Sequence, residues 1–95
     1  IDRGGDRMEP LGVRMLGVLD LAMGSGELKL TSTDPNEQPS LEYHYLEDPF
    51  DKQRMREMVR TCVSIGEGEG FRDIVEYRIE PTEEELSSDD ALDAF

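Results

Sequence analysis

The feature that most constrains the fold is a helix signal that begins at Asp48. Asp48 is a good N-cap residue, and Pro49 suits the first helical position. Asp51 adds favourable negative charge in the first turn, and Gly66 supplies a natural C-terminal stop. Between them, one apolar stripe at i, i+3, i+4 and i+7 predicts a single amphipathic helix, and it consists of Met55, Met58, Val59 and Cys62.

The opposite face of this helix carries a basic row at i+4 spacing, formed by Lys52, Arg56 and Arg60. A solvated face is the simpler interpretation of such a row. The alternative is a docking face for an acidic surface. The chain offers one itself, because Ile79 to Phe95 contains seven acidic residues and no basic ones.

Two apolar segments precede the helix. Residues 13–21 are apolar at nearly every position, which predicts a strand covered on both faces. Gly24-Ser25-Gly26 permits a tight reversal, because glycine reaches positive φ without steric cost. Residues 27–32 then alternate, with Leu28 and Leu30 on one face. The two segments are therefore predicted to pair as an antiparallel hairpin.

The rest of the chain gives shorter signals. Residues 33–40 form a loop with two prolines, and residues 41–46 alternate only briefly. Ile74–Glu80 alternates long enough to predict a third strand, which Pro81 ends. Thr82 and Glu85 form a T-x-x-E capping box for a helical turn from Glu83, and a short helix starts after Ser88.

These elements predict an α+β fold: a small antiparallel sheet, made of a hairpin and a further short strand, with one main helix and a short C-terminal helix. We expect residues 1–95 to be a single fragment of a larger domain, because neither end reads as a natural boundary, with residues 1–10 as a loose linker. The predicted core consists of Leu28, Leu30, Met55, Met58, Val59 and Cys62.

Composition excludes several classes of function. Ten basic residues against 23 acidic ones give a net charge of −13, which disfavours binding to nucleic acid or to anionic membrane surfaces. No apolar run approaches the ~18 residues of a membrane span, and no signal peptide is visible. A cytoplasmic protein is the expectation that follows.

Each candidate site has a simpler structural explanation. Residues 66–70, Gly-Glu-Gly-Glu-Gly, follow a helix and carry two carboxylates, so they predict a linker and not a phosphate-binding loop. Cys62 with His44 as its base would make a nucleophile, but Cys62 lies on the apolar stripe. Six acidic residues are candidates for a cation site, namely Glu83, Glu84, Glu85, Asp89, Asp90 and Asp93. Helix capping and solubility explain these charges more simply than a bound metal does.

A family likeness lies between Gly24 and Leu46. The run Gly-Glu-Leu-Lys-Leu-Thr-Ser-Thr-Asp-Pro over residues 26–35, followed by Pro39 and by Tyr45-Leu46, resembles the glucose–methanol–choline (GMC) oxidoreductases. The preceding apolar segment, the helix from Pro49 and the Pro-Thr-x-x-Glu-Leu-Ser-Ser-Asp-Asp stretch from residue 81 occur in the matching order. Gly24-Ser25 departs from the family's usual Ser-Arg, and His44 from its usual Asn.

The resemblance implies a piece of the substrate-binding region of a flavin-dependent alcohol oxidoreductase similar to choline dehydrogenases. In that family the region is an antiparallel sheet with helices, packed against a separate FAD-binding domain. The family's dinucleotide glycine loop and its H-x-x-G-T motif do not occur in these 95 residues. The resemblance therefore assigns no catalytic, cofactor-binding or metal-binding residue here, and FAD and a small alcohol substrate are expected only in the parent enzyme.

Two functions from different classes stay open at this point. The first is this non-catalytic part of a parent enzyme that oxidises an alcohol by hydride transfer to flavin. The second is a free-standing acidic interaction module, whose apolar segment 13–21 would be an edge for a partner. Either could self-associate through uncovered apolar surface, so a homo-oligomer is compatible with both.

Overall fold

The central element of the computed structural model, which describes residues 12–95, is the long helix α1 over Pro49–Gly66. Its N-terminus is built as predicted, because the Asp48 carboxylate accepts hydrogen bonds from the backbone amides of Phe50 and Asp51, at 2.8 and 3.3 Å. The helix ends at Gly66, and the Glu67 amide donates to the Val63 carbonyl at 3.0 Å. The main helix is therefore confirmed with its cap.

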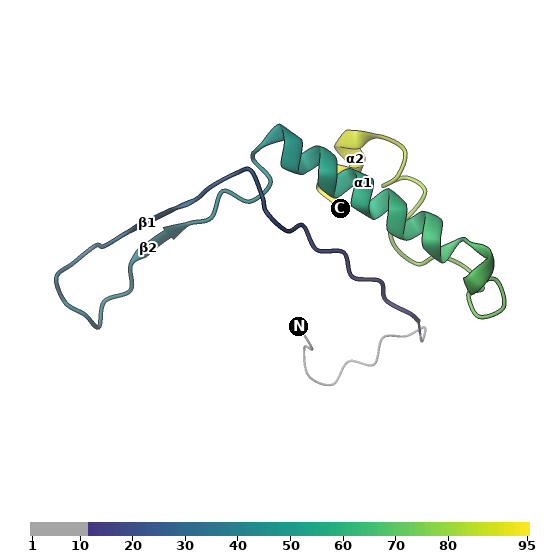
Figure 1. Cartoon of the computed structure of the whole chain (residues 1–95), viewed down its shortest axis with the longest axis horizontal. Helices are drawn as coiled ribbons and strands as arrows, with labels where there is room; N and C mark the ends of the chain where they lie inside the picture. Colours follow the sequence, from purple (N-terminus) through teal and green to yellow (C-terminus); the bar gives the residue numbers. More distant parts are fainter. Residues whose placement is uncertain (1–11) are drawn as a thin grey trace.

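A two-stranded antiparallel hairpin projects from the N-terminal end of α1 as a long arm (Figure 1). It consists of β1 (Glu27–Lys29) and β2 (Ser40–Glu42), with Leu28 opposite Leu41. Residues 30–39 connect the two strands and include the predicted loop 33–40 except for Ser40, which begins β2. Within this connection the Glu37 amide donates to the Asp34 carbonyl at 3.1 Å. The loop is thus the turn of the hairpin.

The hairpin predicted between residues 13–21 and 27–32 is wrong in its pairing. Residues 12–20 are extended but form no strand, and β1 pairs instead with β2. Segment 12–24 lies along α1 in the opposite direction to the helix. Four successive contacts establish this path, joining Met15 to Gly66, Gly17 to Met58, Asp20 to Arg54, and Gly24 to Asp51. The segment therefore follows the helix and not a neighbouring strand, and most of its apolar side chains stay exposed.

Two shorter elements complete the described chain. A 3₁₀ turn, η1 over Glu69–Phe71, follows α1, and the short helix α2 covers Asp89–Ala94. The strand predicted over Ile74–Glu80 is wrong: this stretch is irregular, and Arg78 is fixed by side-chain pairs with Glu67 and Glu83 where a strand would need ladder partners. The fold is the small α+β arrangement expected, with one short sheet, one main helix and a short C-terminal helix.

The chain buries very little of its own apolar surface. Its radius of gyration is 18.2 Å, against about 13 Å for a compact domain of 100 residues. Among the described residues, Leu92 at 6% exposure is the buried large apolar side chain. The predicted core is therefore only partly correct: Met55, Met58, Val59 and Cys62 are half-buried, whereas Leu28 and Leu30 on the arm are exposed.

Within residues 12–95, no helix is both long enough and apolar enough to cross a membrane.

Candidate functional site

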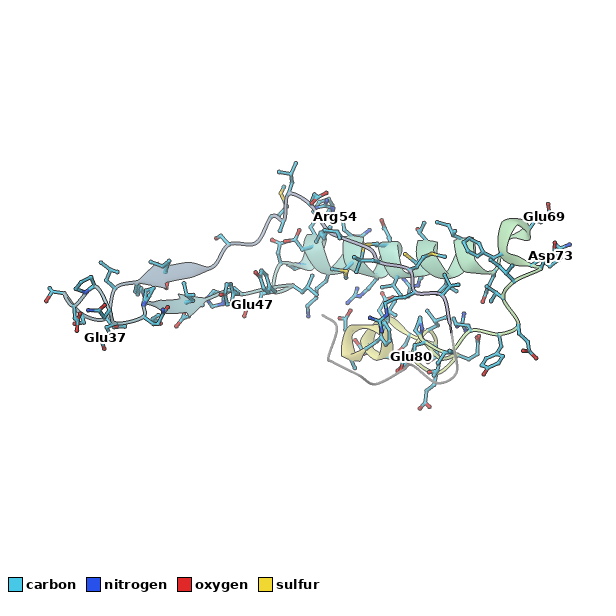
Figure 2. All side chains as sticks on the ribbon, turned by 90° about the horizontal axis from the view of Figure 1, so that it is seen from below. Glu37, Glu47, Arg54, Glu69, Asp73 and Glu80 are labelled. Atoms are coloured by element: carbon cyan, nitrogen blue, oxygen red, sulfur yellow. The ribbon has the colours of Figure 1, made fainter. Side chains whose placement is uncertain are left out.

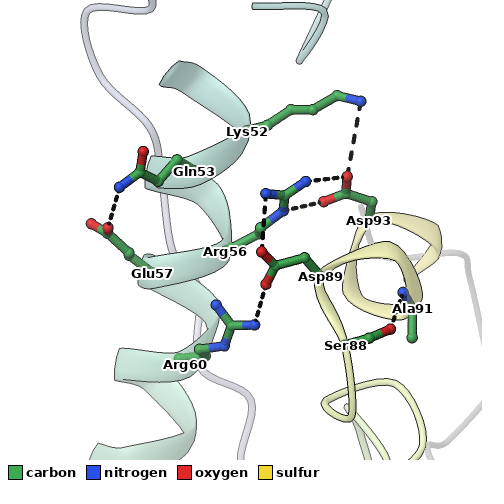
Figure 3. A network of polar contacts seen from close by, with 9 residues as sticks. All are labelled: Lys52, Gln53, Arg56, Glu57, Arg60, Ser88, Asp89, Ala91 and Asp93. Carbon is green, nitrogen blue, oxygen red and sulfur yellow. Dashed lines mark hydrogen bonds and ion pairs between the residues drawn. The ribbon is translucent and has the colours of Figure 1, made fainter. Parts of the chain in front are cut away.

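The densest polar site is a network of ion pairs between α1 and α2 (Figure 3). The Arg56 guanidinium donates two hydrogen bonds to the Asp93 carboxylate, from Nε to Oδ1 and from Nη2 to Oδ2, each at 2.6 Å. Asp89 lies between two arginines, with Arg56 Nη1 at 3.4 Å and Arg60 Nη2 at 2.6 Å. Lys52 Nζ is 3.9 Å from Asp93 Oδ2.

This network follows from matched spacing on two helices. Lys52, Arg56 and Arg60 repeat every four residues on α1, and Asp89 and Asp93 are four apart on α2, so both rows face each other. The Ser88 hydroxyl starts α2 by accepting from the Ala91 amide at 3.1 Å. The basic row is therefore a docking face for the chain's own acidic C-terminal part, and the simpler expectation of a solvated face is wrong.

The electrostatics of the network agree with its geometry. The hydrogen bond from Arg56 holds the pKa of the Asp93 carboxyl below its ordinary value. The hydrogen bond from Arg60 does the same for the pKa of Asp89. The hydrogen bond to Asp93 raises the pKa of Arg56 further above its ordinary value. All three groups are therefore held in their charged forms.

An open groove of about 330 Å³ lies beside this network, lined by Pro49, Gln53, Arg56, Glu57, Arg60 and Asp89. Its charged groups are already matched to one another: the arginines bind Asp89, and Gln53 donates to Glu57 at 3.0 Å. No thiol or imidazole lines the groove. Its walls therefore offer ion pairing and not a nucleophile with its base.

A second polar site joins the start of α1 to segment 12–24. The Asp51 carboxylate, 2% exposed, accepts from the backbone amides of Met23 at 2.9 Å and Gly24 at 2.8 Å. These two hydrogen bonds hold the pKa of Asp51 below its ordinary value. Arg54 donates to the carbonyls of Leu21 at 3.2 Å and Asp20 at 3.0 Å. Together they fix the place beside the first turns of α1 where the chain leaves segment 12–24 and enters the arm, near the Arg54 label in Figure 2.

The structure does not support the nucleophile–base pair that Cys62 and His44 could have formed. His44 lies at the base of the arm, with Nδ1 3.0 Å from Glu47 and Nε2 3.3 Å from Glu42. Both ring nitrogens therefore face carboxylates, and the hydrogen bond with Glu47 raises the pKa of His44. Cys62 is half-buried on α1, as its place on the apolar stripe predicts.

Four of the six acidic candidates for a cation site have structural partners for their carboxylates, namely Glu83, Glu85, Asp89 and Asp93. The Thr82 amide donates to the Glu85 carboxylate at 2.6 Å, and the Glu85 amide donates to the Thr82 hydroxyl at 3.3 Å, which confirms the capping box. Glu83 pairs with Arg78, while Asp89 and Asp93 pair with α1. In the described part of the chain, no group of three or more His, Cys, Asp or Glu residues could hold a metal ion.

Residues 66–70 do not fit a dinucleotide. They follow the C-terminus of α1, where exposed carbonyls and the helix dipole repel phosphate, and Glu67 of this loop pairs with Arg78 at 2.8 Å. The described residues thus contain no glycine loop that opens a helix, which is the arrangement that would cradle a pyrophosphate.

Sequence reasoning missed the partners of Asp51 and the role of Arg54. The sequence indicates Asp51 only as a favourable first-turn charge, because the two backbone amides that donate to its carboxylate lie 27 and 28 residues earlier in the chain. Arg54 had no distinguishing signal, since its two carbonyl partners belong to an apolar segment.

Many large apolar side chains on segment 12–24 and on the arm are exposed. Leu16 is 84% exposed, Leu30 80% and Tyr45 79%. The ring of Tyr45 stacks on that of Tyr43 with centroids 5.1 Å apart, so the two form one apolar patch. Figure 2 shows side chains extending from both faces of the arm. Apolar surface on this scale marks an interface in a stable protein.

Comparison with known proteins gives this interface a context. The family model for GMC oxidoreductase, in its C-terminal domain, matches residues 22–95. The chain belongs to the GMC oxidoreductase family, whose members are FAD flavoproteins.

The similar curated proteins are bacterial enzymes. The chain is 34% identical over 70 residues to an oxygen-dependent choline dehydrogenase of Paraburkholderia phytofirmans, 31% to one of Photobacterium profundum and 33% to one of Paraburkholderia xenovorans. Each match covers 74% of this chain and 12% of the relative, so the chain spans about one eighth of the enzymes it resembles. Among solved structures, none matches it significantly.

Proposed function

We propose that this chain is part of the substrate-binding domain of an FAD-dependent alcohol oxidoreductase of the choline type, and that it is not catalytic in isolation. The observation that carries the proposal is the combination of family membership over residues 22–95 with apolar surface that the chain leaves uncovered. A free-standing interaction module would explain that surface, but it would not explain the family match.

The extended segment 12–24 is the main contact with the rest of the enzyme. Its inward positions, Gly17 and Leu19, are half-buried, whereas Leu16 and Val18, which alternate with them, point outward and are exposed. Such period-two alternation is that of a strand with one face covered. We propose that a further strand or sheet of the parent's substrate-binding domain covers the outward side chains.

The arm is the second contact. An isolated two-stranded hairpin is only marginally stable in water, and here the residues of both strands are exposed. Packing of Leu28, Leu30, Leu41 and Tyr43 against neighbouring parts of the same enzyme would supply the burial that the arm itself lacks.

We propose that the FAD-binding domain of the parent enzyme holds the FAD pyrophosphate, since residues 12–95 contain no glycine loop that opens an α-helix. The described residues of this chain would thus contribute framework and, at the arm, part of the wall between domains. The proposed partner is the FAD-binding domain of the same enzyme, and the proposed substrate is a small alcohol. Cytoplasmic location stays a prediction.

The test is made on the native protein that carries this sequence. Its visible absorption should show a protein-bound flavin, and anaerobic choline should bleach those bands. Tetramethylammonium is the matched control, because it keeps the quaternary cation but has no CH–OH group to oxidise. A native protein without flavin, or one whose flavin is not reduced by any alcohol, would contradict the proposal.

A further inference from the structure

The contact between α1 and α2 is mostly ionic. α2 has only six residues, and helices this short are not stable alone in water. It buries one large apolar side chain, Leu92, whereas two of its carboxylates pair with three cations on α1. The position of α2 therefore depends on charge to an unusual degree.

The pairing is also selective in geometry. Arg56 meets Asp93 through two parallel 2.6 Å hydrogen bonds, and its side chain is 22% exposed against 25% for Asp93. Such a bidentate pair fixes the rotation of one helix against the other, which a single lysine contact cannot do. The side chains of Arg60 and Asp89 are 45% and 55% exposed, so this pair lies at the solvent-exposed edge of the network.

We propose that the basic row of α1 is a receptor for an acidic helix with two carboxylates one turn apart, and that α2 occupies it as an ionic latch. The latch is closed at low ionic strength, and salt opens it while α1 and its contact with segment 12–24 stay folded. The inference rests on the ion-pair geometry and not on the proposed function.

Salt separates the two polar sites because they differ in exposure. At about 1 M ionic strength the Debye length is only about 3 Å, so charge pairs that border solvent lose most of their attraction. Asp51 is 2% exposed and accepts from backbone amides, so screening affects it much less. The charges facing one another across the latch are Lys52, Arg56, Arg60 and Glu57 on α1 and Asp89, Asp90 and Asp93 on α2.

The latch also has an acid limit. The pKa values of Asp89 and Asp93 are lowered by their arginine partners. A lowered folded-state pKa gives stabilisation that is present above the ordinary value and is lost as the pH falls through the folded-state values. The latch should therefore stay closed at neutral pH and open only as the pH falls below the ordinary carboxyl value of 3.8.

The experiment measures the distance between spin labels on the two helices. Cysteines replace the exposed Ser64 on α1 and Ala94 on α2, in a chain where Cys62→Ser removes the native thiol. The labelled chain is diluted into an excess of the same chain without labels, so that copies that associate in salt add no label-to-label distance. The expected result is one narrow distance in dilute buffer and an added, longer and broader population in 1 M NaCl. A single narrow distance in both buffers would overturn the latch, because it would mean that Leu92 alone holds α2.

Variants test the receptor residue by residue. Arg56→Asp should open the latch in dilute buffer. The double variant Arg56→Asp with Asp93→Arg should close it in part, because the swap restores this pair but places like charges beside Asp89 and Lys52. Lys29→Asp makes the same change of charge on the arm and should leave the narrow distance unchanged. Circular dichroism on each variant reports whether α1 is folded. A swapped pair no more closed than Arg56→Asp alone, or a closed latch in Arg56→Asp, would overturn the proposal.

Discussion

The Asp51 carboxylate accepts a 2.8 Å hydrogen bond from the backbone amide of Gly24, across 27 residues of sequence. This contact, with its neighbour from Met23, fixes segment 12–24 to the first turn of the main helix. The direction in which the arm leaves the helix is set at the same place, because the arm begins directly after Gly24.

Replacing Asp51 with Asn should release segment 12–24. An amide side chain presents one oxygen acceptor and an NH₂ group, so one backbone amide would lose its partner and meet a donor. Amide hydrogen exchange at Met23 and Gly24 should accelerate by roughly tenfold. Glu37→Asn at the exposed tip of the arm is the control and should change neither rate. Unchanged exchange in Asp51→Asn would show that apolar contacts alone hold the segment.

A methyl group at Gly26 should separate the strands of the arm. A Cβ atom there would lie 2.1 Å from the Glu42 carbonyl oxygen and 2.9 Å from that of Tyr43, and backbone atoms cannot rotate away. Gly26→Ala should weaken the arm by about 1–3 kcal/mol, measured from amide exchange within β1 and β2. Gly70→Ala is the matched control, because nothing lies within 4 Å of the added atom. Equal effects of the two substitutions would refute the close approach.

His44 should titrate above its ordinary value of 6.5, because its hydrogen bond with Glu47 stabilises the protonated ring. A raised folded-state pKa gives stabilisation that is full below 6.5 and is lost as the pH rises through the folded-state value. The arm should therefore be held more firmly at pH 6 than at pH 9. His44 is the chain's one histidine, so its ring signal in an NMR titration is unambiguous. Glu47→Gln should lower the midpoint, and an unshifted midpoint would contradict the contact.

The 95-residue chain by itself should self-associate. Its uncovered apolar side chains favour association, while its charge of −13 opposes it, so salt should increase the mean mass. Light scattering should give a mass above 10.8 kDa that rises with concentration. The double variant Leu16→Ser with Leu30→Ser should shift the chain towards the monomer. A monomeric mass at every protein concentration, with or without added salt, would show that this surface does not drive self-association.

Local sequence signals were sufficient to predict the helices α1 and α2. The cap at Asp48, the proline at position 49 and the glycine at 66 lie within the helix or next to it, and their effect does not depend on distant residues. The i+4 spacing of the basic row likewise identified the docking alternative, although it could not decide between a solvated row and a docked one. The choice between them required the three-dimensional structure, in which Asp89 and Asp93 of α2 lie against the basic row of α1.

Strand pairing was not encoded locally. β1 has an apolar segment on either side of it, and the glycines at 24 and 26 suggested that it pairs with the earlier one. The structure selects the later one, because Gly26 allows β1 to approach Glu42 closely while Asp51 holds residues 23 and 24 against α1. β2 ends at Glu42, since His44 and Leu46 adopt left-handed backbone angles with φ of 51° and 58°. These causes are tertiary contacts and turn conformations, which the alternation of polar and apolar residues in the sequence does not reveal.

The central claim is that the apolar surface of this chain is an interface within a larger flavoprotein. Side-chain footprinting of the native protein tests it most directly, using the same protein in denaturant as the reference for full labelling. We predict that Leu16, Leu30 and Tyr45 are strongly protected in the native protein, although they are 84%, 80% and 79% exposed in the chain by itself. Labelling of these residues at the rates of the denatured protein would contradict the account.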